Sequence, residues 1–205
     1  MRKLRQDTAT DAPAIPPLPG WIVCVPAEPL DAAAFRSGAA LAHLHAVTAA
    51  SEVPQALWRD RLALAAAEVC AGLSGRREDQ AALRDALHLT RPGDDPGPAG
   101  GILRQWSRAV ARPVSVTSLG RVLDGLAADR IASCLDGPRG TPVDRAAGAL
   151  ASVLTGNPRA ETAALILADA VLSHSVGLDH LLPLLSPTLT PRDVRLRGDA
   201  LRPTC

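Results

Sequence analysis

The sequence predicts an all-α fold, an irregular bundle of about seven to nine helices. Alanine and leucine, the strongest helix formers among the apolar residues, dominate a hydrophobic content of 47%. Aromatic residues, which favour strands, make up only 2% of the chain. Apolar residues also recur every three to four positions, the period of a helix with one buried face. With 21% charged residues, the composition is that of a globular protein.

The length of 205 residues suits one domain flanked by less regular ends. Residues 1–29 are charged and then proline-rich, which predicts an extended N-terminal arm. The β-like run at 21–25 fits an arm lying over the helices better than a strand. Residues 30–186 form the predicted helical domain, and residues 187–205 lack apolar periodicity, as expected of a C-terminal tail.

Three helices are expected in the first half of the domain. The first covers 31–50, with Asp31 as its N-cap. The second carries the clearest helical pattern in the chain and ends at Gly75. Its apolar stripe consists of Trp58, Leu62, Ala65, Ala66, Val69, Cys70 and Leu73. A third helix is expected over 78–89.

A loop rich in Pro, Gly and Asp at 91–100 separates these helices from the rest of the domain. A fourth helix should follow the loop and stop before Pro113. Shorter helices are expected at 117–125, 128–136 and 142–155, then a longer one at 159–175 and a short one near 178–185.

Charge and cysteine content narrow the possible partners and the compartment. The formal net charge is +1, which provides no general attraction to nucleic acid or to an acidic membrane. The four cysteines are scattered without a Cys-x-x-Cys pair, and no apolar run follows the basic N-terminus. We therefore expect a cytoplasmic protein that does not associate with membranes. The sequence leaves its oligomeric state open.

Three carboxylates are candidates for a catalytic role. Asp94 and Asp95 lie in the loop at 91–100, which matches neither the P-loop nor the dinucleotide fingerprint, and one of them capping the next helix is the simplest interpretation. Asp169 interrupts an apolar helix, where it shares a sector of roughly 40° with Thr162 and Ser173. A narrow polar strip on a buried helix explains this pattern without catalysis. No nucleophile motif is recognisable, so the sequence favours a protein that is not an enzyme.

Metal binding is an alternative suggested by His174, Asp179 and His180. Ligands on one helix face stand three or four residues apart, whereas Asp169 and His174 are five apart and about 140° around the helix. His174, Asp179 and His180 lie on both sides of Gly177 and meet only if the connecting loop folds back. We expect no metal and no other cofactor, with these residues as solvated helix-end side chains.

Two charged segments are candidates for binding. The first, which starts the third helix, mixes both signs and suits either a solvated surface or the rim of a protein-binding groove; it comprises Arg76, Arg77, Glu78, Asp79 and Arg84. The second lies in the tail and comprises Arg192, Arg195, Arg197 and Arg202. Asp193 and Asp199 are interspersed with these arginines and no aromatic residue accompanies them, so the case for nucleic-acid binding there is weak.

Several segments resemble a known family. The most specific are Arg-Arg-Glu-Asp at 76–79 and Asp-Asp-Pro-Gly-Pro at 94–98. The others lie at 17–21, 35–41, 61–67, 80–86 and 167–172. Together they resemble the domain-of-unknown-function 1403 family, an uncharacterised alphaproteobacterial group that is often plasmid-borne. The resemblance implies accessory proteins of large replicons and supplies no catalytic residues.

The leading hypothesis is a helical accessory protein that acts as a protein-interaction module in plasmid or replicon maintenance. The first alternative is a small helical enzyme or metal protein that uses Asp169, His174, Asp179 and His180. The second alternative is a DNA-associated accessory protein that binds through its arginine-rich tail.

Overall fold

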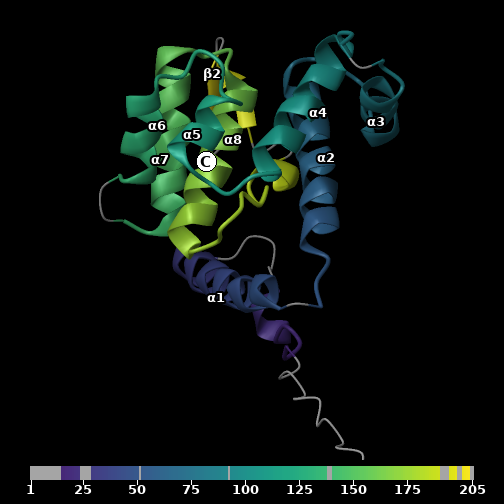
Figure 1. The fold of residues 1–205 in the computed structure, drawn as a ribbon. Coiled ribbons are helices and arrows are strands. Elements are labelled where there is room, and N and C mark those ends of the chain that lie inside the picture. Colours follow the sequence, from purple (N-terminus) through teal and green to yellow (C-terminus); the bar gives the residue numbers. More distant parts are fainter. Residues whose placement is uncertain are drawn as a thin grey trace, which may run out of the picture. The chain divides into compact units, whose positions relative to one another are not determined.

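The computed structural model describes residues 15–23, 29–50, 52–91, 93–137 and 140–189, together with the backbone of 194–197 and 200–203. The chain divides into two compact units, residues 1–53 and 54–205. Eight α-helices in the described residues confirm the all-α fold and its expected number of helices (Figure 1). The predicted division into arm, domain and tail stays a prediction.

Unit 1 contains a short 3-10 helix, η1 (Gly20–Ile22), and the helix α1 (Leu30–Ala49). The Trp21 and Phe35 rings stack with their centroids 5.6 Å apart, and Arg36 Nη1 donates a hydrogen bond of 2.8 Å to the Val23 carbonyl. The N-cap of α1 is Pro29, and Asp31 lies in the first turn, so the prediction of Asp31 as the cap was wrong. A proline before the first turn already has a φ angle compatible with the helix, and the Asp31 carboxylate favours the positive end of the helix dipole.

The first three helices of unit 2 form one group, seen in blue and teal in Figure 1. They are α2 (Gln55–Leu73), α3 (Gln80–His88) and α4 (Gly97–Val110). The predicted stop of α2 is confirmed, because Gly75 adopts a positive φ of 75° directly after the helix. The structure starts α4 inside the predicted loop, at Gly97, since Pro98 is compatible with a first helical turn.

The second group comprises α5 (Val116–Gly120), α6 (Ala128–Leu135), α7 (Pro142–Gly156) and α8 (Glu161–Val176). A capping box starts α7: the Thr141 hydroxyl accepts from the Asp144 amide, and the Asp144 carboxylate accepts from the Thr141 amide. Helix α8 packs along α7 and also contacts α2, α4 and α6, so it lies at the centre of unit 2.

The central position of α8 explains why its side chains are buried. Every residue of α8 from Ala164 to Ser173 is buried, as expected of a helix that is apolar on all sides. Leu165, Ile166 and Leu167 are 0–1% exposed. Among the described helices, none combines the length and hydropathy that crossing a bilayer requires.

The buried face of α2 differs from the predicted stripe. It consists mainly of alanines: Ala63, Ala66, Ala67, Cys70 and Ala71. The larger Leu62 and Val69 are only half-buried, because small side chains allow α4 to approach α2 closely along the alanine face. At this contact the Trp106 indole Nε1 donates to the Cys70 sulfur at 3.3 Å, and both side chains are fully buried.

The prediction of a short helix near 178–185 was wrong. This segment leaves α8 at Gly177, which has a φ of 86°, and continues without helical structure to the 3-10 helix η2 (Ser186–Thr188). Pro183 lacks the amide that a helix would need, and side chains of α8 bind several of the other amides in this segment.

The C-terminal segment contains two short strands, β1 (Val194–Arg197) and β2 (Ala200–Pro203). They pair antiparallel, with Val194 opposite Pro203 and Arg197 opposite Ala200. The sequence analysis, which looked for apolar periodicity, missed the alternation Val-Arg-Leu-Arg, whose period of two favours a strand.

Candidate functional site

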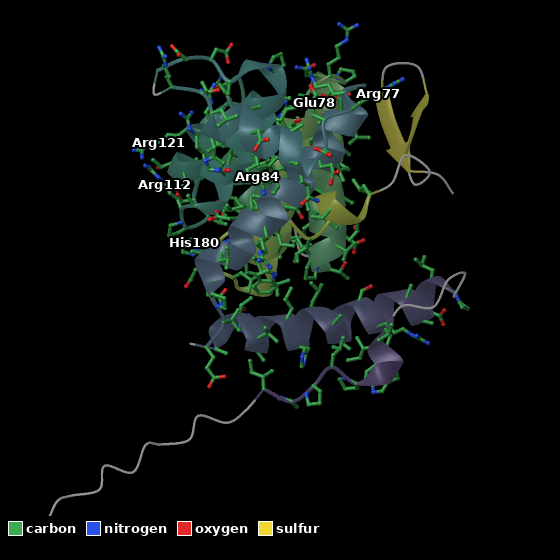
Figure 2. The ribbon with its side chains drawn as sticks, turned by 90° about the vertical axis from the view of Figure 1, so that its right-hand side faces the viewer. Arg77, Glu78, Arg84, Arg112, Arg121 and His180 are labelled. Carbon is green, nitrogen blue, oxygen red and sulfur yellow. The ribbon has the colours of Figure 1, made fainter. Side chains whose placement is uncertain are left out.

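The predicted binding residues Arg76, Arg77, Glu78 and Asp79 lie in the turn between α2 and α3. Figure 2 labels Arg77 and Glu78 there. Arg76 Nη1 is 3.5 Å from Glu78 Oε1, and the Arg77 amide donates to Glu78 Oε2 at 3.0 Å. Hydrogen bonds from the Glu78 and Arg77 backbone amides lower the pKa of the Glu78 carboxyl. The negative charge of Glu78 is therefore already bound by groups of its own turn.

Helix α3 carries the other residues of this predicted rim. Asp79 is the N-cap, and its Oδ1 accepts from the Ala82 amide at 2.8 Å. Arg84 is exposed, with its Nε 3.8 Å from Asp85 Oδ1. Leu83 is the only buried residue of α3, so most of this helix surface is open to a partner. A role for these residues in binding stays a prediction.

The two loop carboxylates are exposed and occupy the start of α4. Asp95 Oδ1 accepts a hydrogen bond of 3.0 Å from the Gly97 amide, the first residue of the helix. The N-cap of α4 is Pro96, so Asp95 binds the first helical amide from one position before the cap and is not the N-cap residue itself. Asp94 lies beside it, and its own amide donates to the Arg91 carbonyl at 3.0 Å.

Asp169 lies in α8 and is completely buried. Its Oδ1 accepts from the amides of Leu184 and Leu185 at 2.9 and 2.7 Å. Its Oδ2 accepts from the Ser186 amide at 3.3 Å and the Ser186 hydroxyl at 2.7 Å. Three consecutive amides thus converge on one carboxylate, an arrangement that suits an anion.

Ser173 extends the same contact one turn further along α8. Its hydroxyl oxygen accepts from the Leu182 amide at 2.9 Å and is 3.4 Å from the Leu182 carbonyl. Asp169 and Ser173 together fasten residues 182–186 to α8. We name this arrangement, comprising Asp169, Ser173 and Ser186, the α8 clasp.

The clasp gives Asp169 a structural role. Burial raises the pKa of its carboxyl from 3.8 to about 6, although the hydrogen bonds from Leu185, Ser186 and Leu184 oppose this rise. Both carboxylate oxygens are occupied by the chain itself, and the side chain has no exposed surface. Asp169 is therefore not accessible from the surface in this structure.

The candidate metal ligands do not converge. His174 and Asp179 are exposed, and the Asp179 carbonyl accepts from the Val114 amide at 2.8 Å. His180 is half-buried in an isolated bridge to Pro113. Burial and the charge of Arg59 lower the pKa of its imidazole. Within the described residues, no three His, Cys, Asp or Glu side chains gather as a metal would require.

Four arginines that the sequence analysis did not single out form a basic surface on unit 2. Arg104 and Arg108 lie on α4, Arg112 follows the end of α4, and Arg121 follows α5. In Figure 2 the side chains of Arg112 and Arg121 extend from the same edge. We name these four residues the arginine face.

Two adjoining hollows lie on the arginine face. The first, of about 190 Å³, is lined by Arg104, Arg108 and Arg121, with Asp124 as the only acidic residue. The second, of about 440 Å³, is lined by Arg108, Arg112 and Arg121. Arg108 and Arg121 thus belong to both hollows, and the four guanidinium groups border one continuous surface.

Buried side chains hold the arginine face in place. Leu119, Val122 and Leu123 are at most 8% exposed and anchor the turn that carries Arg121. Gln105 Nε2 donates to the Val122 carbonyl at 2.9 Å and so joins this turn to α4. On α4, Leu103 and Trp106 point into the core, which leaves the arginines on the opposite side of the helix.

The arginine face has an unbalanced positive charge. Among the residues that the structure describes, none of its four arginines forms an ion pair or a side-chain hydrogen bond. Like charges on successive turns of one helix repel each other. The spacing of Arg104, Arg108 and Arg112 by four residues was the sequence signal for this surface. Arg121 comes from another element, so only the fold could add it.

Comparison with known proteins identifies the family. A family model described as a protein of unknown function (DUF1403) matches residues 6–204, nearly the whole chain. The chain belongs to this family. The comparisons found no similar curated protein and no similar solved structure. Membership in DUF1403 confirms the resemblance seen in the sequence and assigns no activity to any residue.

Proposed function

We propose that this DUF1403 protein is a non-catalytic helical accessory module that binds an anionic partner on its arginine face. The observation that carries the proposal is the set of four unpaired arginines bordering two joined hollows. Arginine presents a planar fork of donors that suits carboxylate and phosphate groups. A role in plasmid or replicon maintenance, and a cytoplasmic location, are the context that the family resemblance and the composition suggest.

Electrostatics supports an interaction surface over a purely structural one. Four positive charges near one another, with Asp124 as the single acidic residue lining the hollows, repel, and an anion placed between them reduces that repulsion. Arg108, Arg112 and Arg121 are exposed, so a partner reaches them without rearrangement of the core. The mixed-charge residues at the start of α3 add a second predicted contact region for a protein partner.

Retention on immobilised heparin, a general polyanion, tests the proposal. The test variant replaces Arg104, Arg108, Arg112 and Arg121 by Gln. The control variant replaces the exposed Arg61, Arg91, Arg130 and Arg159 by Gln. Each variant loses four positive charges and falls from a net charge of +1 to −3, so net charge is matched. Circular dichroism verifies that both variants keep their helical content.

We expect the test variant to elute at clearly lower salt than the control variant, because only the test variant loses the clustered charges. Equal elution of the two variants would mean that retention depends on net charge alone and would contradict the proposal. Replacing Arg77 and Arg84 by Gln tests the α3 region separately. If that pair carries the retention, the predicted rim replaces the arginine face as the binding surface.

A further inference from the structure

We infer that the anionic partner of the arginine face is the phosphate backbone of duplex DNA. This inference rests on the proposed function and specifies its ligand. Guanidinium groups bind phosphate oxygens through two parallel hydrogen bonds, and contacts of this kind position a protein on DNA without reading its sequence.

The arrangement of the arginines suits an anion with several charges. Arg104, Arg108 and Arg112 follow each other at intervals of four residues. Arg104 and Arg108 lie one turn apart on α4, so their Cα positions are about 6 Å apart along the helix axis, and Arg112 follows just after the helix ends. Arg121 borders both hollows and widens the row on one side. Several cations along one surface fit a polymer that carries many negative charges better than a single small anion.

The residues around the arginines also favour a backbone contact. No aromatic residue lines either hollow, so no platform for stacking of unpaired bases is present there. Ser118 lines the second hollow, and hydroxyl groups are frequent donors to phosphate. Asp124 opposes any anion at one side of the first hollow.

This site differs from the predicted nucleic-acid site in the tail. The strands β1 and β2, which form a hairpin separate from the helices, contain Arg195, Arg197 and Arg202, and the fourth predicted residue, Arg192, lies outside the described residues. The arginine face is built on α4 and the turn after α5, both of which are anchored in the core. The inference therefore assigns DNA contact to a rigid surface of unit 2.

Fluorescence anisotropy with labelled 20-base-pair duplexes of two unrelated sequences tests the inference on the full chain. Binding is measured from 50 to 200 mM NaCl. If four phosphates are neutralised, the slope of log K against log salt should be about −3.6. Each single variant, Arg104→Gln, Arg108→Gln, Arg112→Gln or Arg121→Gln, should reduce the magnitude of this slope by about 0.9 and weaken both duplexes equally. Arg159→Gln should leave the slope unchanged.

Poly-glutamate of matched total charge is the second probe and separates the inference from the proposed function. Binding of poly-glutamate through the arginine face, without binding of either duplex at 50 mM salt, overturns the inference and leaves the proposed function standing. If neither polyanion binds at 50 mM salt, both fail. Loss of duplex binding only when Arg195, Arg197 and Arg202 are changed to Gln would overturn the inference in favour of the hairpin.

Discussion

At the scale of single residues, the buried carboxylate of Asp169 joins α8 to the segment that follows it. It receives four hydrogen bonds, and all four come from the segment at Leu184–Ser186. An unmade hydrogen bond in a buried position costs about 1–3 kcal/mol, so the clasp strongly favours this path of the chain over the predicted helix. The same hydrogen bonds leave the carboxylate no free oxygen for chemistry.

The raised pKa of Asp169 predicts a pH dependence of stability. The folded protein holds the Asp169 proton more tightly than the unfolded chain, because its pKa is about 6 against 3.8. The contribution of this group is therefore complete below pH 3.8 and declines as the pH rises to about 6. At 1.36 kcal/mol per pKa unit, the decline amounts to about 3 kcal/mol.

Asp169→Asn should remove this decline and also lower the overall stability, since an amide cannot accept all four hydrogen bonds. The measurement is the free energy of unfolding in urea between pH 4 and pH 7, taken as the difference between the native protein and the variant. That difference should shrink as the pH rises from 4 to 6. A constant difference over this range would show that Asp169 does not titrate there.

The sequence revealed part of this residue-scale picture. The helical wheel placed Thr162, Asp169 and Ser173 on one narrow polar strip, and the structure confirms a strip that binds other parts of the chain. The partners were not predictable, because they are backbone amides of a segment whose residues, such as Leu184 and Leu185, look like helix formers. Local propensity was overridden by a long-range contact.

At the scale of elements, most helices were predictable because their apolar period is clear. The predicted ranges 128–136, 142–155 and 159–175 match α6, α7 and α8 to within two residues. Predictions failed where the local helix propensity competed with long-range hydrogen bonds, as in the segment after Gly177. The arginine face was not predicted because it combines α4 with a residue from a different element.

Replacing either of two glycines by alanine should change the stability of the protein in opposite directions. Gly177 ends α8 with a φ of 86°, and the amides of Gly177 and Leu178 donate back to the His174 and Ser173 carbonyls. Gly177→Ala should cost about 1 kcal/mol, because a residue with a Cβ is strained in the left-handed region. Gly148 lies inside α7, where an added Cβ meets no atom within 4 Å.

Gly148→Ala is the matched partner of this experiment and should stabilise the protein by about 0.5–1 kcal/mol, since alanine loses less entropy in a helix. Thermal unfolding of both variants measures the two effects. A fall in stability for Gly148→Ala, or no change for Gly177→Ala, would contradict the assigned helix interior and helix end.

At the scale of the whole molecule, unit 2 has its own hydrophobic core. The connected core cluster consists of residues between Ala63 and Leu181, with Trp106 as its largest fully buried side chain. A fragment covering residues 54–205 should therefore unfold in urea as one cooperative transition and keep its helical circular dichroism signal. A fragment that unfolds gradually would show that residues 1–53 are required for this core.

The central claim is that a polyanion binds at the arginine face. Its most direct test follows the Nε–H resonances of the arginine side chains in a nuclear magnetic resonance titration of the full chain with inorganic tripolyphosphate, a small polyanion. The account predicts that the perturbed resonances are those of Arg104, Arg108, Arg112 and Arg121, while those of Arg61 and Arg159 stay in place. Equal perturbation of all arginines, or perturbation confined to the hairpin residues Arg195, Arg197 and Arg202, would contradict it.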